Sequence, residues 1–88
     1  MGMYKEQIRD FLARCMRKER KRRNLSQDKM SERLHVTPRA YSDLERGKYC
    51  MSASSLLFFL SELSDEEAVQ VIREFRVLIR ETENQEKE

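Results

Sequence analysis

The stretch that most constrains the fold covers residues 25–48 and reads as two short helices joined by a tight corner. Ser26 can cap the first helix, because its hydroxyl can accept a backbone N–H that the first helical turn leaves unpaired. Thr37 can cap the second helix, and Pro38 follows at the first helical position, where a missing N–H costs nothing. Gly47 ends this second helix, since glycine adopts a positive φ without strain. These signals predict a helix-turn-helix, and its second helix is the candidate element for reading DNA bases.

Both short helices place apolar residues along one face. Met30 and Leu34 lie four positions apart in the first helix, and Tyr41 and Leu44 lie three apart in the second. Residues at these spacings share one side of a helix. The pattern therefore predicts two helices packed against the same core, with the small side chain of Ser31 allowing them to approach closely.

The same residues resemble the XRE family, the helix-turn-helix of phage repressors and Cro proteins. The resemblance covers roughly residues 11 to 63 and runs through Leu25-Ser26-Gln27, Met30-Ser31, Leu34, Val36-Thr37, Leu44-Glu45-Arg46-Gly47-Lys48 and Leu56-Leu57. It departs from the family where His35 replaces the usual corner glycine and where Met51 replaces a usual proline. Histidine tolerates a positive φ better than most residues do. The resemblance implies an all-α fold, a small phage repressor-like bundle of about five helices with a long C-terminal helix.

The resemblance also implies a structural ion pair. Members of the family carry an arginine in the first helix that pairs with a glutamate in the last turn of the reading helix. Arg20 and Glu45 match these two positions. Such a pair mainly fixes geometry, because the desolvation of the two charges offsets much of their attraction.

By resemblance, the residues after the corner enter the major groove of DNA. The candidates for base contact are Pro38, Arg39, Ser42 and Asp43. Arg39 is the strongest of them, because a guanidinium can bind guanine O6 and N7 with two parallel hydrogen bonds. Asp43 can accept from a cytosine amine, or it can orient Arg39 four positions away. The candidates for contact with the DNA backbone are Ser26, Gln27, Thr37, Arg22, Arg23, Arg46 and Lys48.

A first helix is predicted over residues 4–23, where apolar residues recur three and four positions apart. Its second half is strongly basic and contains Arg14, Arg17, Lys18, Arg20, Lys21, Arg22 and Arg23. One interpretation is phosphate contact, with Arg22 and Arg23 favoured because they lie nearest the corner. The alternative is a solvated face whose cations are well placed near a helix C-terminus.

The fourth helix begins at a serine cap, which is Ser52 or Ser54. It carries more apolar residues than one stripe can hold. We expect Leu56, Leu57 and Leu60 to fill the core, so that Phe58 or Phe59 faces outward or lies under the last helix. An exposed aromatic patch would indicate a partner.

The last helix begins at Ser64 with a capping box that ends at Glu67. Its apolar residues repeat at three and four positions, close to a heptad seam. This stripe is longer than a small core requires, which favours dimerisation through Val71, Ile72, Phe75, Leu78 and Ile79. The alternative is that the stripe packs back along the first helix.

Charge is distributed unevenly along the 88 residues, although the net charge is only +2. Residues 1–60 contain 14 Lys/Arg and 7 Asp/Glu, whereas residues 61–88 contain 4 and 9. A basic body followed by an acidic end fits a polyanion-binding domain with a segment that faces elsewhere. We expect a DNA-binding domain over residues 1–63, a C-terminal helix and possible dimerisation element over 64–82, and a frayed tail over 83–88.

Several functional classes are not favoured by the sequence. No apolar run approaches the roughly 20 residues of a membrane span, and the first ten residues are too charged for a secretory signal, which favours the cytoplasm. Cys15 and Cys50 lack metal-ligand spacing and are expected to be free thiols. We expect no metal and no cofactor. No nucleophile is paired with a base, so enzyme activity is not expected.

These features together predict a sequence-specific DNA-binding transcriptional regulator. The expected form is a homodimeric repressor on double-stranded DNA, with half-sites about 34 Å apart. The alternative is an antitoxin-like or adaptor module whose main partner is another protein, bound through the Phe58 and Phe59 surface or through the last helix.

Overall fold

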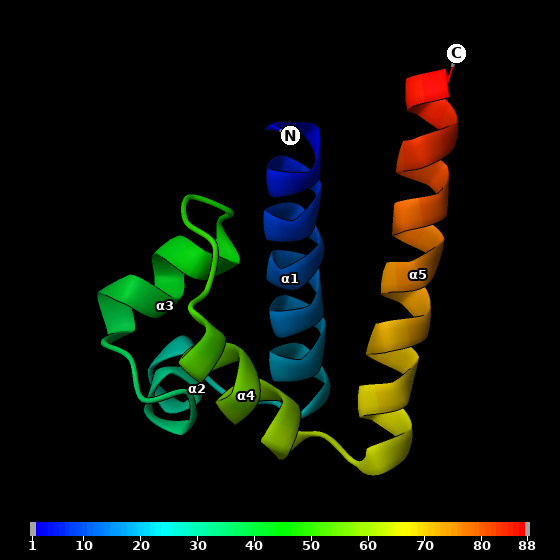
Figure 1. Ribbon diagram of the computed structural model, residues 1–88. Helices are drawn as coiled ribbons and strands as arrows, with labels where there is room; N and C mark the ends of the chain where they lie inside the picture. The colour runs from blue at the N-terminus through cyan, green and yellow to red at the C-terminus, as the bar shows by residue number, and fades with distance from the viewer. Residues whose placement is uncertain (1, 88) are drawn as a thin grey trace.

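The computed structural model describes residues 2–87, with side chains placed for residues 4–85, and contains five α-helices (Figure 1). They are α1 (Gly2–Arg22), α2 (Gln27–Arg33), α3 (Pro38–Glu45), α4 (Ala53–Glu62) and α5 (Asp65–Lys87). The predicted all-α bundle is confirmed, since no strand occurs in this range. α5 continues through residues 83–87, so it ends later than predicted; Glu88 lies outside the described residues. No helix within residues 2–87 is long and apolar enough to cross a membrane.

The first three helices end in the same way. Each is followed by a residue with a positive φ: Asn24 at 56°, His35 at 59° and Gly47 at 73°. The next N–H then bonds to the carbonyl five positions back, from Leu25 to Arg20 at 3.0 Å, from Val36 to Ser31 at 3.1 Å and from Lys48 to Asp43 at 2.9 Å. This Schellman arrangement satisfies carbonyls that a helix end leaves unpaired. It turns the chain sharply at three points, and His35 adopts the conformation that glycine usually supplies at the corner between α2 and α3.

The core lies where α1, α2, α3 and α4 meet. Its most buried large side chains are each at most 1% exposed and comprise Met16, Met30, Leu34, Tyr41 and Phe59. Burial of each large apolar side chain contributes about 1.5–3 kcal/mol. α3 packs mainly against α2 and α1, so the core itself sets the orientation of the reading helix.

α4 turns a different face inward from the one predicted. Leu57 was expected in the core but is 68% exposed, whereas Phe59 is 1% exposed. Successive residues of a helix are about 100° apart, so Leu57 lies about 200° around the helix from Phe59. With the larger ring in the core, Leu57 has to face solvent. Leu56 and Leu60 are partly buried against the core.

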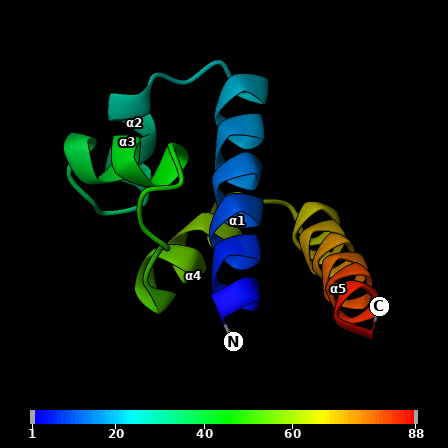
Figure 2. The ribbon, with the colours of Figure 1, turned by 90° about the horizontal axis from the view of Figure 1, so that it is seen from above.

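α5 runs antiparallel to α1, on the side of α1 away from α3 (Figure 1, Figure 2). The predicted capping box is present at its start: the Ser64 N–H donates to Glu67 Oε1 at 2.8 Å, and the Glu67 N–H donates to Ser64 Oγ at 3.1 Å. The rings of Phe11 on α1 and Phe75 on α5 contact each other, with centroids 5.7 Å apart. The helix therefore packs back along α1, the alternative that the sequence left open.

Part of the predicted dimer seam takes part in this packing. Val71, Phe75 and Leu78 are partly buried against the core of their own chain. Ile72 remains 47% exposed, and Ile79 is half-buried. The apolar stripe of α5 is wider than the face that contacts α1. Its inner part, the side toward α1, packs within the chain, and its outer part, the side away from α1, stays exposed to solvent.

Candidate DNA-binding surface

α3 presents its N-terminal turn to solvent and buries the rest of one face. Thr37 caps the helix by accepting the Ala40 N–H on its hydroxyl at 3.1 Å. Pro38 and Arg39 in the first turn are exposed, and Ser42 is half-buried one turn later. Tyr41, between them in the chain, is fully buried. The first turn is therefore the part of α3 that can enter a groove of DNA.

Glu45 holds the end of α3 against α1. Arg20 donates to both of its carboxylate oxygens at 2.8 Å, and to the carbonyl of Leu25 at 3.1 Å. The two side chains are 17% and 5% exposed. Gln27 donates to the same carboxylate at 3.4 Å, and Arg17 donates to the Glu45 carbonyl at 3.1 Å. The forked arrangement of Arg20 and Glu45 fixes direction as well as distance between α1 and α3.

The electrostatics of this pair keep both partners charged. Burial alone would raise the pKa of Glu45, but the hydrogen bonds from Arg20 hold that pKa below its usual range. Burial raises the pKa of the neighbouring Tyr41, and the Glu45 carboxylate raises it further. Tyr41 therefore stays neutral beside the ion pair.

A family comparison matches this part of the molecule. The model of a helix-turn-helix family matches residues 16–63, which is 48 of the 88 residues. The chain belongs to the XRE-type helix-turn-helix family. It is thus a DNA-binding helix-turn-helix regulator. No curated protein and no solved structure matches the chain. The match begins within α1 and ends after α4, so α5 lies outside the matched XRE domain.

Asp43, a predicted base contact, is paired within the XRE domain. It is 7% exposed, and Arg46 donates to its carboxylate at 2.5 Å. The Arg46 guanidinium holds the pKa of Asp43 below its usual range, and Lys48 adds to this effect. No hydrogen bond joins Asp43 to Arg39 within the described part of the chain. Asp43 therefore stabilises the end of α3, because its carboxylate is directed to the following turn rather than outward.

Arg22 and Arg23 are likewise occupied within the molecule. Arg22 pairs with Glu19, and with Glu67 on α5 at 2.7 Å. Arg23 pairs with Glu19 at 2.7 Å and with Glu62 at the end of α4 at 3.2 Å. Their contact with the DNA backbone stays a prediction, and the Arg22 side chain is still 52% exposed. Their position at the end of α1 brings them against carboxylates from α4 and α5, which were distant in the sequence.

The remaining candidates for backbone contact lie at the two ends of the XRE motif. Ser26 is exposed and accepts the Lys29 N–H at 3.1 Å, and Gln27 is half-buried beside it at the start of α2. Arg46 and Lys48 are exposed just after α3. Thr37 is exposed at the start of α3, and Arg46 is also paired with Asp43; contact of these side chains with DNA stays a prediction.

Tyr49 was missed by sequence reasoning and belongs to the same surface. It is 58% exposed, and the Lys48 ammonium lies 5.5 Å from its ring centroid. A hollow of about 410 Å³ separates the loop that carries Tyr49 from α3, and Arg39 lines its other side. The sequence did carry a signal for this contact, because Lys48 and the large aromatic Tyr49 directly follow Gly47.

The corner of the motif also has an exposed ring contact. The rings of His35 and Phe58 have centroids 4.1 Å apart and are tilted by 32°. Phe58 is 40% exposed, so Phe58 rather than Phe59 is the outward aromatic residue of α4. The contact covers part of Phe58 and braces the corner between α2 and α3.

Proposed function

We propose that this regulator binds double-stranded DNA as a homodimer, reads the major groove with α3, and represses transcription by occupying its operator. The observation that supports this most is the exposure of Arg39 in the first turn of a helix whose other end is fixed by Arg20 and Glu45. An exposed guanidinium on a helix that is fixed in this way can donate two parallel hydrogen bonds to guanine. Such a contact discriminates guanine from other bases by about 1–3 kcal/mol. Pro38 and Ser42 flank it and contribute shape and an adaptable hydroxyl.

The contacts that position α3 would come from both ends of the motif. The start of α2, with Ser26 and Gln27, offers backbone N–H groups and a favourable dipole to one phosphate. Thr37, Arg46 and Lys48 lie around the ends of α3 and suit phosphates on either side. Contacts of this kind set register and orientation without reading sequence. A protein that binds DNA acts in the compartment that contains the DNA. The sequence favours the cytoplasm as that compartment.

The dimer would use the outer part of the α5 stripe. Val69 is 44% exposed and Ile72 is 47% exposed on α5. Ile72 borders an apolar hollow of about 180 Å³ that is also lined by Ile8 and Leu56. A two-fold axis beside these residues would bury an apolar surface that water now covers, and apolar burial is the main driving force of such association. Paired reading helices would then meet half-sites about 34 Å apart.

The test is selection of bound duplexes from a random DNA pool, at salt near 0.15 M to suppress binding to phosphates alone. We expect enrichment of an inverted repeat. Arg39→Ala should lose about 1–3 kcal/mol of discrimination at one base pair of each half-site, while Lys18→Ala, at an exposed lysine of α1, should select the wild-type motif. A pool without any enriched motif would reject sequence-specific reading.

A further inference from the structure

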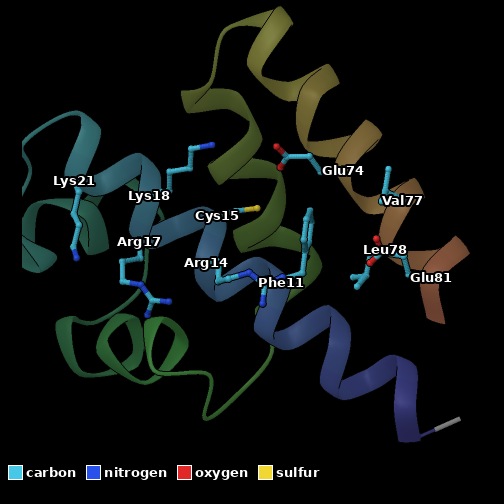
Figure 3. Close-up of a pocket in the computed structure, with 10 residues that line it drawn as sticks. All are labelled: Phe11, Arg14, Cys15, Arg17, Lys18, Lys21, Glu74, Val77, Leu78 and Glu81. Atoms are coloured by element: carbon cyan, nitrogen blue, oxygen red, sulfur yellow. The ribbon is translucent and has the colours of Figure 1, made fainter. Parts of the chain in front are cut away.

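A cleft separates α1 from α5 on a part of the molecule that the DNA-binding surface does not use (Figure 3). Its volume is about 580 Å³. α3 lies on one side of α1 and α5 on the other (Figure 1, Figure 2), so the cleft is separated from the first turn of α3 by the width of α1. A molecule in this cleft could be bound while Arg39 contacts DNA.

The α1 wall of the cleft is formed by cations without carboxylate partners. Arg14, Lys18 and Lys21 are exposed and line the cleft, and none of them forms an ion pair within the part of the chain that the structure describes. Their spacing of four and three residues places them in a row about 10 Å long on one side of α1. By contrast, Arg20 and Arg22 on the same helix are paired with carboxylates.

A fourth cation and two carboxylates complete the charged lining. Arg17 lies at the edge toward α3, where it donates to the Glu45 carbonyl. Glu74 and Glu81 line the α5 wall, and Glu74 accepts a hydrogen bond from Gln70 at 3.4 Å. Four cations therefore face two carboxylates, and the positive charge is concentrated on α1.

The floor between the two walls is apolar. It consists of Phe11 and Cys15 from α1 with Val77 and Leu78 from α5. Val77 is 47% exposed. Burial raises the pKa of the Cys15 thiol to about 11, so the thiol is uncharged at neutral pH. The floor thus offers apolar surface that water covers in the isolated chain.

We propose that this cleft binds an acidic amphipathic helix of another protein. Two antiparallel helices with an apolar floor between them can accept a third helix along the groove, as in other helix-in-groove complexes. Acidic residues on one flank of that helix would meet Arg14, Lys18 and Lys21. The flank facing Glu74 and Glu81 would be neutral or basic, which sets the direction of binding.

A second copy of this chain fits the cleft less well than an acidic partner does. Three arginines of α5 are exposed, namely Arg73, Arg76 and Arg80. If α5 of a second copy entered the cleft, these arginines would approach the cation row on α1, and like charges at an interface are unfavourable. The cleft and the dimer surface proposed around Ile72 are therefore assigned to different partners.

The test uses the full-length protein and a designed helical peptide of about 15 residues, long enough for four turns. The peptide has leucines along one stripe and glutamates on one flank, and a matched peptide carries lysines in place of the glutamates. We expect the acidic peptide alone to bind, with affinity that falls as salt rises, and to shift the amide resonances of α1 and α5. Lys18→Glu and Val77→Asp should each weaken binding by at least about tenfold.

Lys5→Glu changes an exposed lysine of the same helix outside the cleft and should leave peptide binding unchanged, as should Arg39→Ala. Peptide binding that is absent up to about 1 mM, or unaffected by Lys18→Glu, would overturn the proposal. Loss of self-association in Val77→Asp would also overturn it and assign the cleft to a second copy. Operator binding is measured separately, so failure of the DNA model leaves this result interpretable.

Discussion

Glu45 joins three parts of the helix-turn-helix through one side chain and one carbonyl. Its carboxylate receives Arg20 from α1 and Gln27 from α2, and its carbonyl receives Arg17. Removing one partner of a buried ion pair leaves the other charge uncompensated, which costs about 3–5 kcal/mol. The orientation of the reading helix therefore depends on a residue that does not itself face DNA.

The lowered pKa of Glu45 predicts a specific dependence of stability on pH. A carboxyl group whose folded pKa lies below its unfolded value contributes stability above about pH 4.5, and this is lost as the pH falls through the folded pKa. We expect Glu45→Gln to lower the free energy of unfolding by about 3 kcal/mol at pH 7 and to flatten the loss below pH 4.5. Urea unfolding from pH 7 to pH 3 measures both effects.

Glu83→Gln removes an exposed carboxylate and serves as the control, with no expected change in the profile. Some acid dependence should remain in Glu45→Gln, because the pKa values of Glu19 and Asp43 are also lowered. A Glu45→Gln protein with wild-type stability and a wild-type pH profile would contradict the role assigned to the pair.

Gly47 is the second residue whose substitution has a clear expected outcome. Its φ is +73°, and an added Cβ would lie 3.2 Å from Asp10 Oδ1. That side chain can rotate away, so the backbone conformation dominates the cost of Gly47→Ala, about 1–2 kcal/mol. Asn24→Gly, at the equivalent turn after α1, should cause no such loss. Thermal unfolding of the two variants distinguishes them, and equal stability of Gly47→Ala and the wild type would be the contrary result.

At the scale of the helices, the starts of α2, α3 and α5 were predictable because their capping signals are local in sequence, whereas the end of α5 was not. Ser26, Thr37, Ser52 and Ser64 each accept a backbone N–H three residues later. The face of α4 was not predictable, since Leu57 and Phe59 have similar hydrophobicity and only the space available in the core selects the ring. The partners of charged side chains were also hidden, because Glu62 lies 39 residues from Arg23.

The capping box of α5 gives a prediction at this scale. Ser64→Ala removes the hydroxyl that accepts the Glu67 N–H, and loss of a cap typically costs about 1 kcal/mol. We expect a lower melting temperature and faster hydrogen exchange in the first turn of α5. The control is Ser61→Ala, whose hydroxyl bonds within α4 to the Phe58 carbonyl. Unchanged exchange in α5 after Ser64→Ala would show that packing alone holds that turn.

At the scale of the whole molecule, one part of the apolar stripe of α5 is buried against α1 and the other part is exposed to solvent. Phe75 packs on Phe11 within the chain, whereas Ile72 stays exposed. The sequence could not decide between these outcomes, because packing on α1 and packing on a second chain require the same periodicity. The resemblance supplied the candidate DNA contacts, which stay predictions. The pairing of Asp43, Arg22 and Arg23 within the chain could not be predicted, since it depends on neighbours brought together by the fold.

The exposed part of this stripe predicts the effect of Ile72→Glu on self-association. A charge at this position would have to be buried in the proposed dimer, so we expect the sedimentation mass to fall from that of a dimer to that of a monomer. Val77→Glu introduces the same change at an equally exposed residue of α5 and should leave the mass of the dimer unaltered. A dimer that persists in Ile72→Glu would place the two-fold axis elsewhere.

The two buried acids of α3 have a consequence for how this protein can evolve. Asp43 and Glu45 are bonded to arginines within the fold, while Pro38 and Arg39 project freely and Ser42 is only half-buried. Under the proposed function, substitutions at these three positions alter which operator is recognised with little effect on folding, because surface changes of this kind usually alter stability by less than about 0.5 kcal/mol. New binding specificities are therefore accessible through single substitutions, without compensating changes in the scaffold.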